Sequence, residues 1–368
     1  MADLAGNRQI VRLRRVLRSR FISPRLWVRR CAFWTGALAI AVIAILFADA
    51  ADLAAGWFTA TVAARPWLAW GMIPAGFMAA VLLTIHVFPG AGGSGIPQAI
   101  AAIHIRDPAK VRAMLSLRIA FGKVALTLLG LACGASVGRE GPTVQVGASI
   151  MHTLGLWLRL PRHDLQRGLI LAGGAAGIAA AFNTPLAGIV FAIEELSHSF
   201  EARASGTVFT AVIIAGVTTL ALVGNYSYFG HTTAELTLRT GWVAVLVCSA
   251  VGGVAGGLFA AVLIRAARGF PGLLGRAIRW QPMLFAGLCG LVVAGVGILS
   301  RGETYGTGYA QARSAVEGHA DLVTAYPLLK LVANIASYLS GIPGGIFAPS
   351  LAVGATLGHV LSHSLAAP

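Results

Sequence analysis

Long apolar segments alternate with short polar connections along most of the chain. The apolar segments cover residues 33–48, 67–88, 119–134, 168–181, 206–223, 242–264, 283–299, 328–339 and 346–361. Several approach the roughly 20 residues that an α-helix needs to cross a bilayer, and others are short enough to be tilted, re-entrant or broken. We therefore predict an all-α, polytopic membrane protein in which residues 33–368 form one transmembrane domain.

The distribution of charged residues predicts how this domain is oriented in the membrane. The chain is 57% hydrophobic and 11% charged, with a formal net charge of +15. Arginines and lysines gather in the arm 1–32 and in connections 106–118, 159–167 and 265–279, whereas connection 224–240 has one arginine and one glutamate. Such an excess in alternate short connections marks the cytoplasmic side. We predict a cytoplasmic N-terminus, and we expect no nucleic-acid partner.

The arm 1–32 itself permits two interpretations. It is either a basic helix lying on anionic membrane lipid or a simple topology signal. Both interpretations place the arm outside the transmembrane domain.

Three glycine-rich blocks interrupt this apolar sequence, at 92–97, 138–142 and 343–349. Backbone that is broken at membrane depth must line a cavity or be buried in protein, because lipid offers no partner for its N–H groups. Glycine-rich turns that open helices also direct N–H donors and the positive end of the helix dipole toward one point. Secondary transporters use broken helices of this kind near the bilayer midplane. The blocks therefore predict an anion path.

Acidic residues inside the membrane are the next candidates. Glu140 lies in the second glycine block, and Glu194 and Glu195 follow the apolar stretch 186–193. A carboxylate at this depth usually marks an ion path or a proton relay. Ionised Glu140 can occupy an anion site itself and leave it once protonated, which would couple proton and anion movement. The alternatives are a structural acid at Glu140 and a solvated helix end at Glu194 and Glu195.

Other chemistry finds little support. The four cysteines are scattered, the histidines lack the spacing of a metal cluster, and no nucleophile–base arrangement is visible. We expect no enzymatic activity, no cofactor and no metal.

Five motifs, taken together, resemble the CLC family of chloride channels and chloride/proton antiporters. They are Gly93-Ser94-Gly95-Ile96-Pro97, Gly138-Arg139-Glu140-Gly141-Pro142, Phe182-Asn183-Thr184-Pro185-Leu186-Ala187-Gly188, Ile193-Glu194-Glu195 and Gly344-Gly345-Ile346-Phe347-Ala348-Pro349. The resemblance implies an inverted-repeat fold in a cell membrane, with the bacterial inner membrane expected. It also implies a homodimer with one pathway per subunit, which carries chloride and protons.

The resemblance also assigns roles to residues. It implies that Glu140 is the extracellular gate and Glu195 the intracellular proton-transfer residue. Chloride would be bound by the Ser94 hydroxyl and by backbone groups; the latter belong to Gly138, Arg139, Gly141, Ile346 and Phe347. The Arg139 side chain could either steer anions or hold the local structure.

Antiport is favoured within the family because antiporters resemble this chain in having a glutamate at the position of Glu195. Ser94 resembles the chloride-selective version, and the intact Gly-Arg-Glu-Gly-Pro argues against the fluoride-exporting branch. A passive voltage-gated-type chloride channel and an inactive membrane subunit are the alternatives.

Family members continue after the last motif through further helices and a tyrosine that contacts the anion. Because this sequence ends at Pro368, we expect an incomplete second repeat, with none of its own tyrosines placed to substitute.

Overall fold

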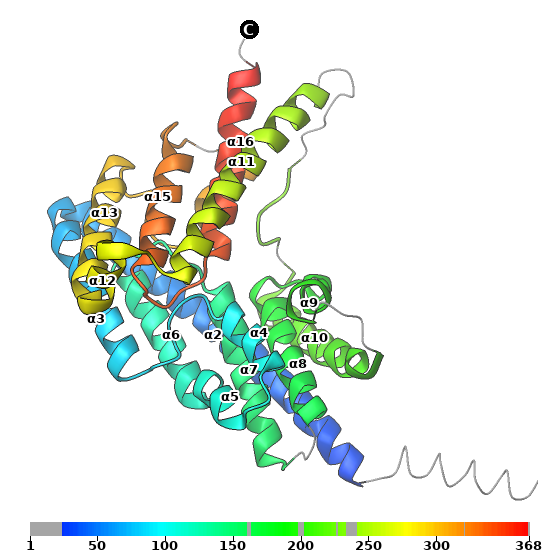
Figure 1. Ribbon diagram of the computed structural model, residues 1–368. Helices are drawn as coiled ribbons and strands as arrows, with labels where there is room; N and C mark the ends of the chain where they lie inside the picture. The colour runs from blue at the N-terminus through cyan, green and yellow to red at the C-terminus, as the bar shows by residue number, and fades with distance from the viewer. Residues whose placement is uncertain are drawn as a thin grey trace, which may run out of the picture.

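The computed structural model describes residues 24–159, 163–197, 202–225, 227–232, 241–319 and 321–366. Most of these residues lie in helices, and the described part of the chain contains no strand beyond one isolated β-bridge (Figure 1). The helices of the first half are α2 (Pro24–Ala64), η1 (Pro66–Leu68), α3 (Ala69–His86), α4 (Ile96–His104), α5 (Pro108–Met114), α6 (Leu117–Ala132), α7 (Glu140–Trp157), α8 (His163–Ala181), α9 (Pro185–Phe191), the π-helical η2 (Ala192–Ser197) and α10 (Ala202–Val223). The second half contributes α11 (Gly241–Arg268), α12 (Gly272–Trp280), α13 (Pro282–Leu299), α14 (Tyr309–Glu317), α15 (Tyr326–Leu339) and α16 (Phe347–Ala366).

Five helical segments are long and apolar enough to cross a membrane. Others are much too short, since α4 and α14 have 9 residues each and α9 has 7. Proline stands in the first turn of α4, α9, α13 and α15, where its missing N–H is not needed and its fixed φ favours a helix start. The predicted mixture of spanning and broken helices is confirmed.

The first helix, α2, is longer than its apolar segment. It runs across the expected boundary at residue 32 without a break and continues past Asp49 and Asp52. Residues 1–23 of the predicted arm lie outside the described part of the chain.

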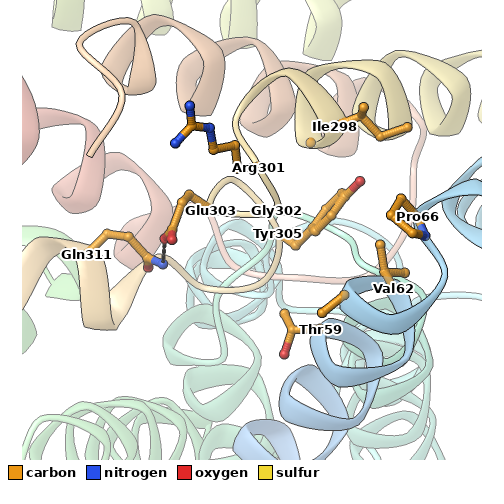
Figure 2. A pocket seen from close by; sticks show the side chains of 11 residues that line it. Thr59, Val62, Pro66, Ile298, Arg301, Gly302, Glu303, Tyr305 and Gln311 are labelled. Atoms are coloured by element: carbon orange, nitrogen blue, oxygen red, sulfur yellow. Dashed lines mark hydrogen bonds between the residues drawn. The ribbon is translucent and has the colours of Figure 1, made fainter. Parts of the chain in front are cut away.

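The C-terminal ends of α2 and α13 border a cavity of about 670 Å³, where Gln311 donates a hydrogen bond to Glu303 (Figure 2).

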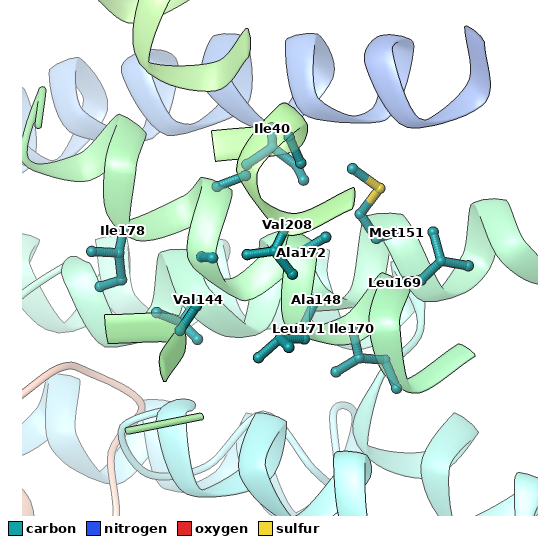
Figure 3. Close-up of a cluster of buried hydrophobic side chains, with 14 of the residues drawn as sticks. Ile40, Val144, Ala148, Met151, Leu169, Ile170, Leu171, Ala172, Ile178 and Val208 are labelled. Carbon is teal, nitrogen blue, oxygen red and sulfur yellow. The ribbon is translucent and has the colours of Figure 1, made fainter. Parts of the chain in front are cut away.

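The largest apolar core joins α2, α7, α8 and α10 (Figure 3). Small residues let these helices approach closely: a methyl group at Gly147 would overlap with the Gly173 carbonyl, and one at Gly173 with the Gly147 carbonyl. Ala148 and Ala172 are fully buried in the same core. Interfaces of small residues are typical of packed membrane helices, because they bring the backbones together. This packing fixes α7, the helix that begins with Glu140.

The second half repeats features of the first. The 9-residue helices α4 and α14 each follow a loop whose carbonyls accept hydrogen bonds from a fully buried lysine. Lys123 of α6 donates to Gly92 and Gly93, and Lys330 of α15 donates to Thr304 and Gly306. This correspondence agrees with the expected inverted repeat.

Helix α11 differs from the rest. It lies beside α16 and α15 (Figure 1), yet none of the residues in its most apolar window is buried. Trp242, Leu246, Val254 and Leu258 along it are all more than 60% exposed.

Candidate functional site

The three glycine-rich blocks meet at one place. Gly138 and Gly345 exchange two backbone hydrogen bonds, with N···O distances of 2.6 and 2.7 Å. Gly344 N–H donates to the Gly93 carbonyl at 3.2 Å. Helices α4, α7 and α16 begin within three residues of these contacts, so their N-termini converge. The predicted meeting of the three motifs is therefore confirmed.

Glycine is required where the blocks touch. Gly95, the N-cap residue of α4, has a φ of +106°, and a methyl group there would lie 2.7 Å from the Gly141 carbonyl oxygen. A methyl group at Gly141 would lie 2.5 Å from the Ser94 hydroxyl oxygen. The start of α7 thus packs directly on Ser94, which is 6% exposed. No larger residue could occupy either glycine position without displacing backbone.

Glu140 occupies the centre of this arrangement as the first residue of α7. Its side chain is buried, and Oε1 accepts a 2.9 Å hydrogen bond from the Tyr228 hydroxyl. No described residue donates to Oε2. A buried carboxylate oxygen without a donor is costly, but the N-terminus of α7 supplies a positive electrostatic environment at this position.

A cavity of about 660 Å³ opens beside Glu140. Its walls come from α4, α7, α8, α9, α16 and the connection after α10, and they consist of Ile96, Glu140, Ile178, Phe182, Asn183, Thr184, Ala187, Phe191, Asn225, Ser227, Tyr228, Phe229, Phe347 and Leu351. Three of the contributing helices present their first or second residue to it. The space combines aromatic walls with helix N-termini, which suits a small anion.

The remaining predicted residues differ in where they lie relative to the cavity. Arg139 is 8% exposed, and its guanidinium donates to the Ala48 carbonyl at 2.6 Å and to Asp52 at 3.1 Å, both on α2. It ties α7 to α2 and is not among the residues that line the cavity. These two hydrogen bonds are contacts of the kind that the structural role requires, one of the two alternatives left open by the sequence. Ile346 directly precedes α16, and Phe347, its first residue, is 42% exposed toward the cavity side.

Glu195 lies apart from this site. It sits in η2 with an exposed side chain, as does Glu194, while the neighbouring Leu196 is fully buried. Helix α9 starts at the cavity and leads into η2, so Glu195 stands ten residues beyond Pro185. The helical rise makes this separation roughly 15 Å. The structure therefore does not bring Glu195 and Glu140 together in one cavity.

Comparison with known proteins decides the family. A sequence profile of the family described as "Voltage gated chloride channel" matches residues 75–368. The chain belongs to this family.

Curated relatives in the voltage gated chloride channel family are similar over much of their length. The H(+)/Cl(-) exchange transporter ClcA of Yersinia pestis bv. Antiqua (strain Angola) is 32% identical over 304 residues, covering 78% of this chain and 60% of that protein. ClcA of Cronobacter sakazakii (strain ATCC BAA-894) is 31% identical over 348 residues, covering 89% and 72%. The chain thus spans 60% of the length of the Yersinia relative.

Two solved structures of antiporters share the fold. A slow cyanobacterial Cl−/H+ antiporter superposes with a TM-score of 0.73 at 23% identity, covering 93% of this chain and 80% of the other. A CLC-type fluoride/proton antiporter superposes with a TM-score of 0.74 at 25% identity, covering 93% and 84%. With five candidate spans, the chain is a multi-pass membrane protein.

Sequence reasoning missed Tyr228. This residue belongs to no motif and lies in a connection that drew attention only for its low charge. We expected none of the tyrosines to substitute for the one that contacts the anion in family members. The structure places the Tyr228 hydroxyl on Glu140, a contact that the sequence did not predict. The signal that could have found it is the aromatic pair Tyr228-Phe229 in an otherwise polar loop.

Proposed function

We propose that this chain catalyses proton-coupled chloride antiport with Glu140 as the gate. In the ionised state, the Glu140 carboxylate occupies the cavity and excludes chloride. Protonation removes its charge, the neutral side chain leaves, and chloride enters the positive environment of the helix N-termini. Because the proton and the anion act on the same place, their movements are coupled.

One observation supports the proposal above the others: the buried Glu140 carboxylate lines the cavity at the meeting point of three helix N-termini, with Oε2 lacking a donor among the described residues. Because Oε2 has no donor among these residues, it is the oxygen at which this group can take up a proton. Similarity to the H(+)/Cl(-) exchange transporters supports the same conclusion. The Gly138 N–H, an expected chloride contact, already donates to the Gly345 carbonyl. We propose chloride contacts from the Ser94 hydroxyl and the backbone N–H groups at Arg139, Gly141, Ile346 and Phe347.

For the proton, we propose a path that enters on the cytoplasmic side at Glu195. Its exposed position can exchange protons with water, and α9 connects it to the cavity. The roughly 15 Å of helix between Pro185 and Glu195 exceeds one hydrogen bond, so we propose that water carries the proton from Glu195 to the cavity. Replacing Glu195 by glutamine should lower the proton-to-chloride ratio while chloride flux continues.

Liposomes test the function directly. The purified chain is reconstituted, a chloride gradient is imposed, and internal pH and chloride are recorded together. We expect wild-type protein to move protons in the direction opposite to the chloride flow. Glu140→Gln should carry chloride without moving protons. Glu303→Gln is the matched control, since that glutamate lies in the other cavity, and it should keep wild-type coupling. Chloride flux without proton movement in the wild type would identify a passive channel, and silent vesicles from folded protein would reject transport.

The transported anion is part of the proposal. Chloride is favoured by Ser94, although the fold alone is shared with a fluoride/proton antiporter. The same vesicles loaded with fluoride, bromide or nitrate rank the anions by flux. A fluoride rate above the chloride rate would overturn the chloride assignment.

The proposed oligomeric state, membrane and orientation follow from the family resemblance. We propose a homodimer in the cell membrane with one pathway per subunit, a cytoplasmic N-terminus and surrounding lipid as a partner. We further propose that the chain is a transporter without enzymatic activity, because the relatives are named as transporters. Cross-linking in native membranes tests the dimer.

A further inference from the structure

The contact between Tyr228 and Glu140 joins two distant parts of the chain inside the membrane domain. Tyr228 is 8% exposed and Glu140 is 1% exposed, and the 2.9 Å bond between them is the hydrogen bond that the described residues provide to this carboxylate. Tyrosine stays protonated at neutral pH, because its usual pKa is about 10. Its hydroxyl is therefore a donor to an ionised carboxylate, which is the stronger class of hydrogen bond.

Aromatic packing fixes the Tyr228 ring independently of this bond. The ring centroid lies 5.1 Å from that of Phe182, 4.8 Å from Phe229 and 4.5 Å from Tyr309. Phe182 in turn contacts Phe347, the first residue of α16, at 5.4 Å. Edge and tilted contacts of this kind are favourable in themselves. The ring therefore keeps its place whether or not Glu140 accepts from it.

The backbone around Tyr228 is also closed on itself. The Ser227 hydroxyl donates to the Gly230 carbonyl at 2.7 Å, and Gly230 N–H donates to the Ser227 carbonyl at 3.3 Å. Gly230 has a φ of +77°, which this tight turn requires. The turn presents Tyr228 to the cavity from the connection after α10.

We propose that Tyr228 is a positioning residue for the gate, whose hydroxyl keeps ionised Glu140 in the anion cavity. This inference rests on the proposed function. The carboxylate leaves the cavity only when the bond from Tyr228 breaks. Protonation at Oε2 makes the carboxyl group neutral and a weaker acceptor, so the bond weakens as the proton arrives. Tyr228 thereby biases the competition between carboxylate and chloride toward the carboxylate.

The test is a chloride-binding measurement by titration calorimetry in detergent at neutral pH, which needs no transport. Tyr228→Phe retains the packed ring and removes only the hydroxyl. We expect its chloride affinity to rise about tenfold, the size expected from losing one hydrogen bond to a charged group. Tyr305→Phe is the matched control, because that buried tyrosine donates to the Ala294 carbonyl at 3.3 Å away from the cavity, and its affinity should equal that of the wild type.

A second background separates positioning from direct binding. In Glu140→Ala no carboxylate remains to be positioned, so adding Tyr228→Phe should change the affinity by less than about twofold, the error expected of independent sites. A loss of affinity in this background would overturn the proposal and make Tyr228 an anion ligand. Unchanged affinity of Tyr228→Phe in the wild-type background would overturn it as well.

Two further measurements test the role of Tyr228. Incorporation of 3-fluorotyrosine at position 228 retains the ring and the hydroxyl but makes the hydroxyl a more acidic, stronger donor. The Glu140 carboxylate should then be held more firmly, and chloride affinity should fall. A rise in affinity would contradict the proposal even if Tyr228→Phe failed to fold. In liposomes, Tyr228→Phe should lower the proton-to-chloride ratio. Wild-type protein that binds chloride but moves no protons would overturn the antiport function and leave the Tyr228 assignment standing, whereas an absence of chloride binding in wild type and Glu140→Ala would overturn both.

Discussion

At the residue scale, the space around Gly138 is set by the carboxylate it faces. A methyl group on Gly138 would overlap with Glu140 Oε2 and would lie 3.2 Å from Pro349 Cδ and 3.3 Å from Ala348 Cβ. The carboxylate is the movable neighbour, so Gly138→Ala should expel Glu140 from its place. We expect proton coupling to be lost and the free energy of unfolding to fall by about 1–3 kcal/mol, the usual range for overpacking.

The control for this change is Gly256→Ala on α11, where a methyl group would meet nothing within 4 Å. It should leave coupling intact and should not lower the unfolding temperature in detergent. Coupled transport in liposomes and thermal unfolding are measured on both variants. Full coupling in Gly138→Ala would show that Glu140 does not occupy the position we assign to it during transport.

Single residues also show what a sequence can and cannot predict. Ser94, Glu140 and Phe347 were found because each lies in a glycine-rich motif with a local physical reason. Tyr228 was missed because its partner is 88 positions away, and only the tertiary fold brings them together. The Arg139 side chain had two possible roles for the same reason, since its acceptors on α2 are remote in sequence.

At the element scale, the loops before α4 and α14 offer a matched comparison. Lys123 and Lys330 are both fully buried, and each donates to two backbone carbonyls. Substitution by methionine leaves those carbonyls without their donor, at a cost of roughly 1–3 kcal/mol per buried group. We expect both Lys123→Met and Lys330→Met to lower the unfolding temperature.

The two variants should differ in anion binding. The loop that Lys123 contacts carries Ser94, whereas the loop that Lys330 contacts leads to Tyr309 at the start of α14, which packs on Tyr228 but does not line the cavity beside Glu140. Chloride titration should therefore show weaker binding in Lys123→Met and a smaller change in Lys330→Met. Equal affinities in the two variants would mean that the Ser94 loop does not contribute to the site.

Helix boundaries were the weaker part of the sequence prediction. The first apolar segment ended at residue 48, yet α2 continues to Ala64 because a helix needs only its own backbone bonds to pass Asp49 and Asp52. Short elements were predicted better. Glycine and proline in the three blocks require breaks in the backbone, and the breaks at α4, α7 and α16 occur there.

At the scale of the whole molecule, the distribution of the net charge of +15 predicts a topology. Arg265, Arg268, Arg276 and Arg279 lie at the end of α11 and on α12, while the connection between α2 and α3 contains a single arginine, Arg65. Positive residues are retained in the cytoplasm during insertion. We therefore predict that α12 lies on the cytoplasmic side and Arg65 on the opposite side.

Two exposed arginines, Arg65 and Arg276, make this orientation measurable. In a background without the four native cysteines, Arg65→Cys should react with a membrane-impermeant maleimide in intact cells, and Arg276→Cys should react only after lysis. The two variants lose the same charge and gain the same thiol, so a difference in labelling reports the side of the membrane. The orientation also bears on the direction of the gate, because we predict that the sparsely charged connection holding Tyr228 lies on the same side as Arg65. Reversed labelling would place Tyr228 and the opening beside Glu140 in the cytoplasm, and the proton would then have to reach Glu195 from outside.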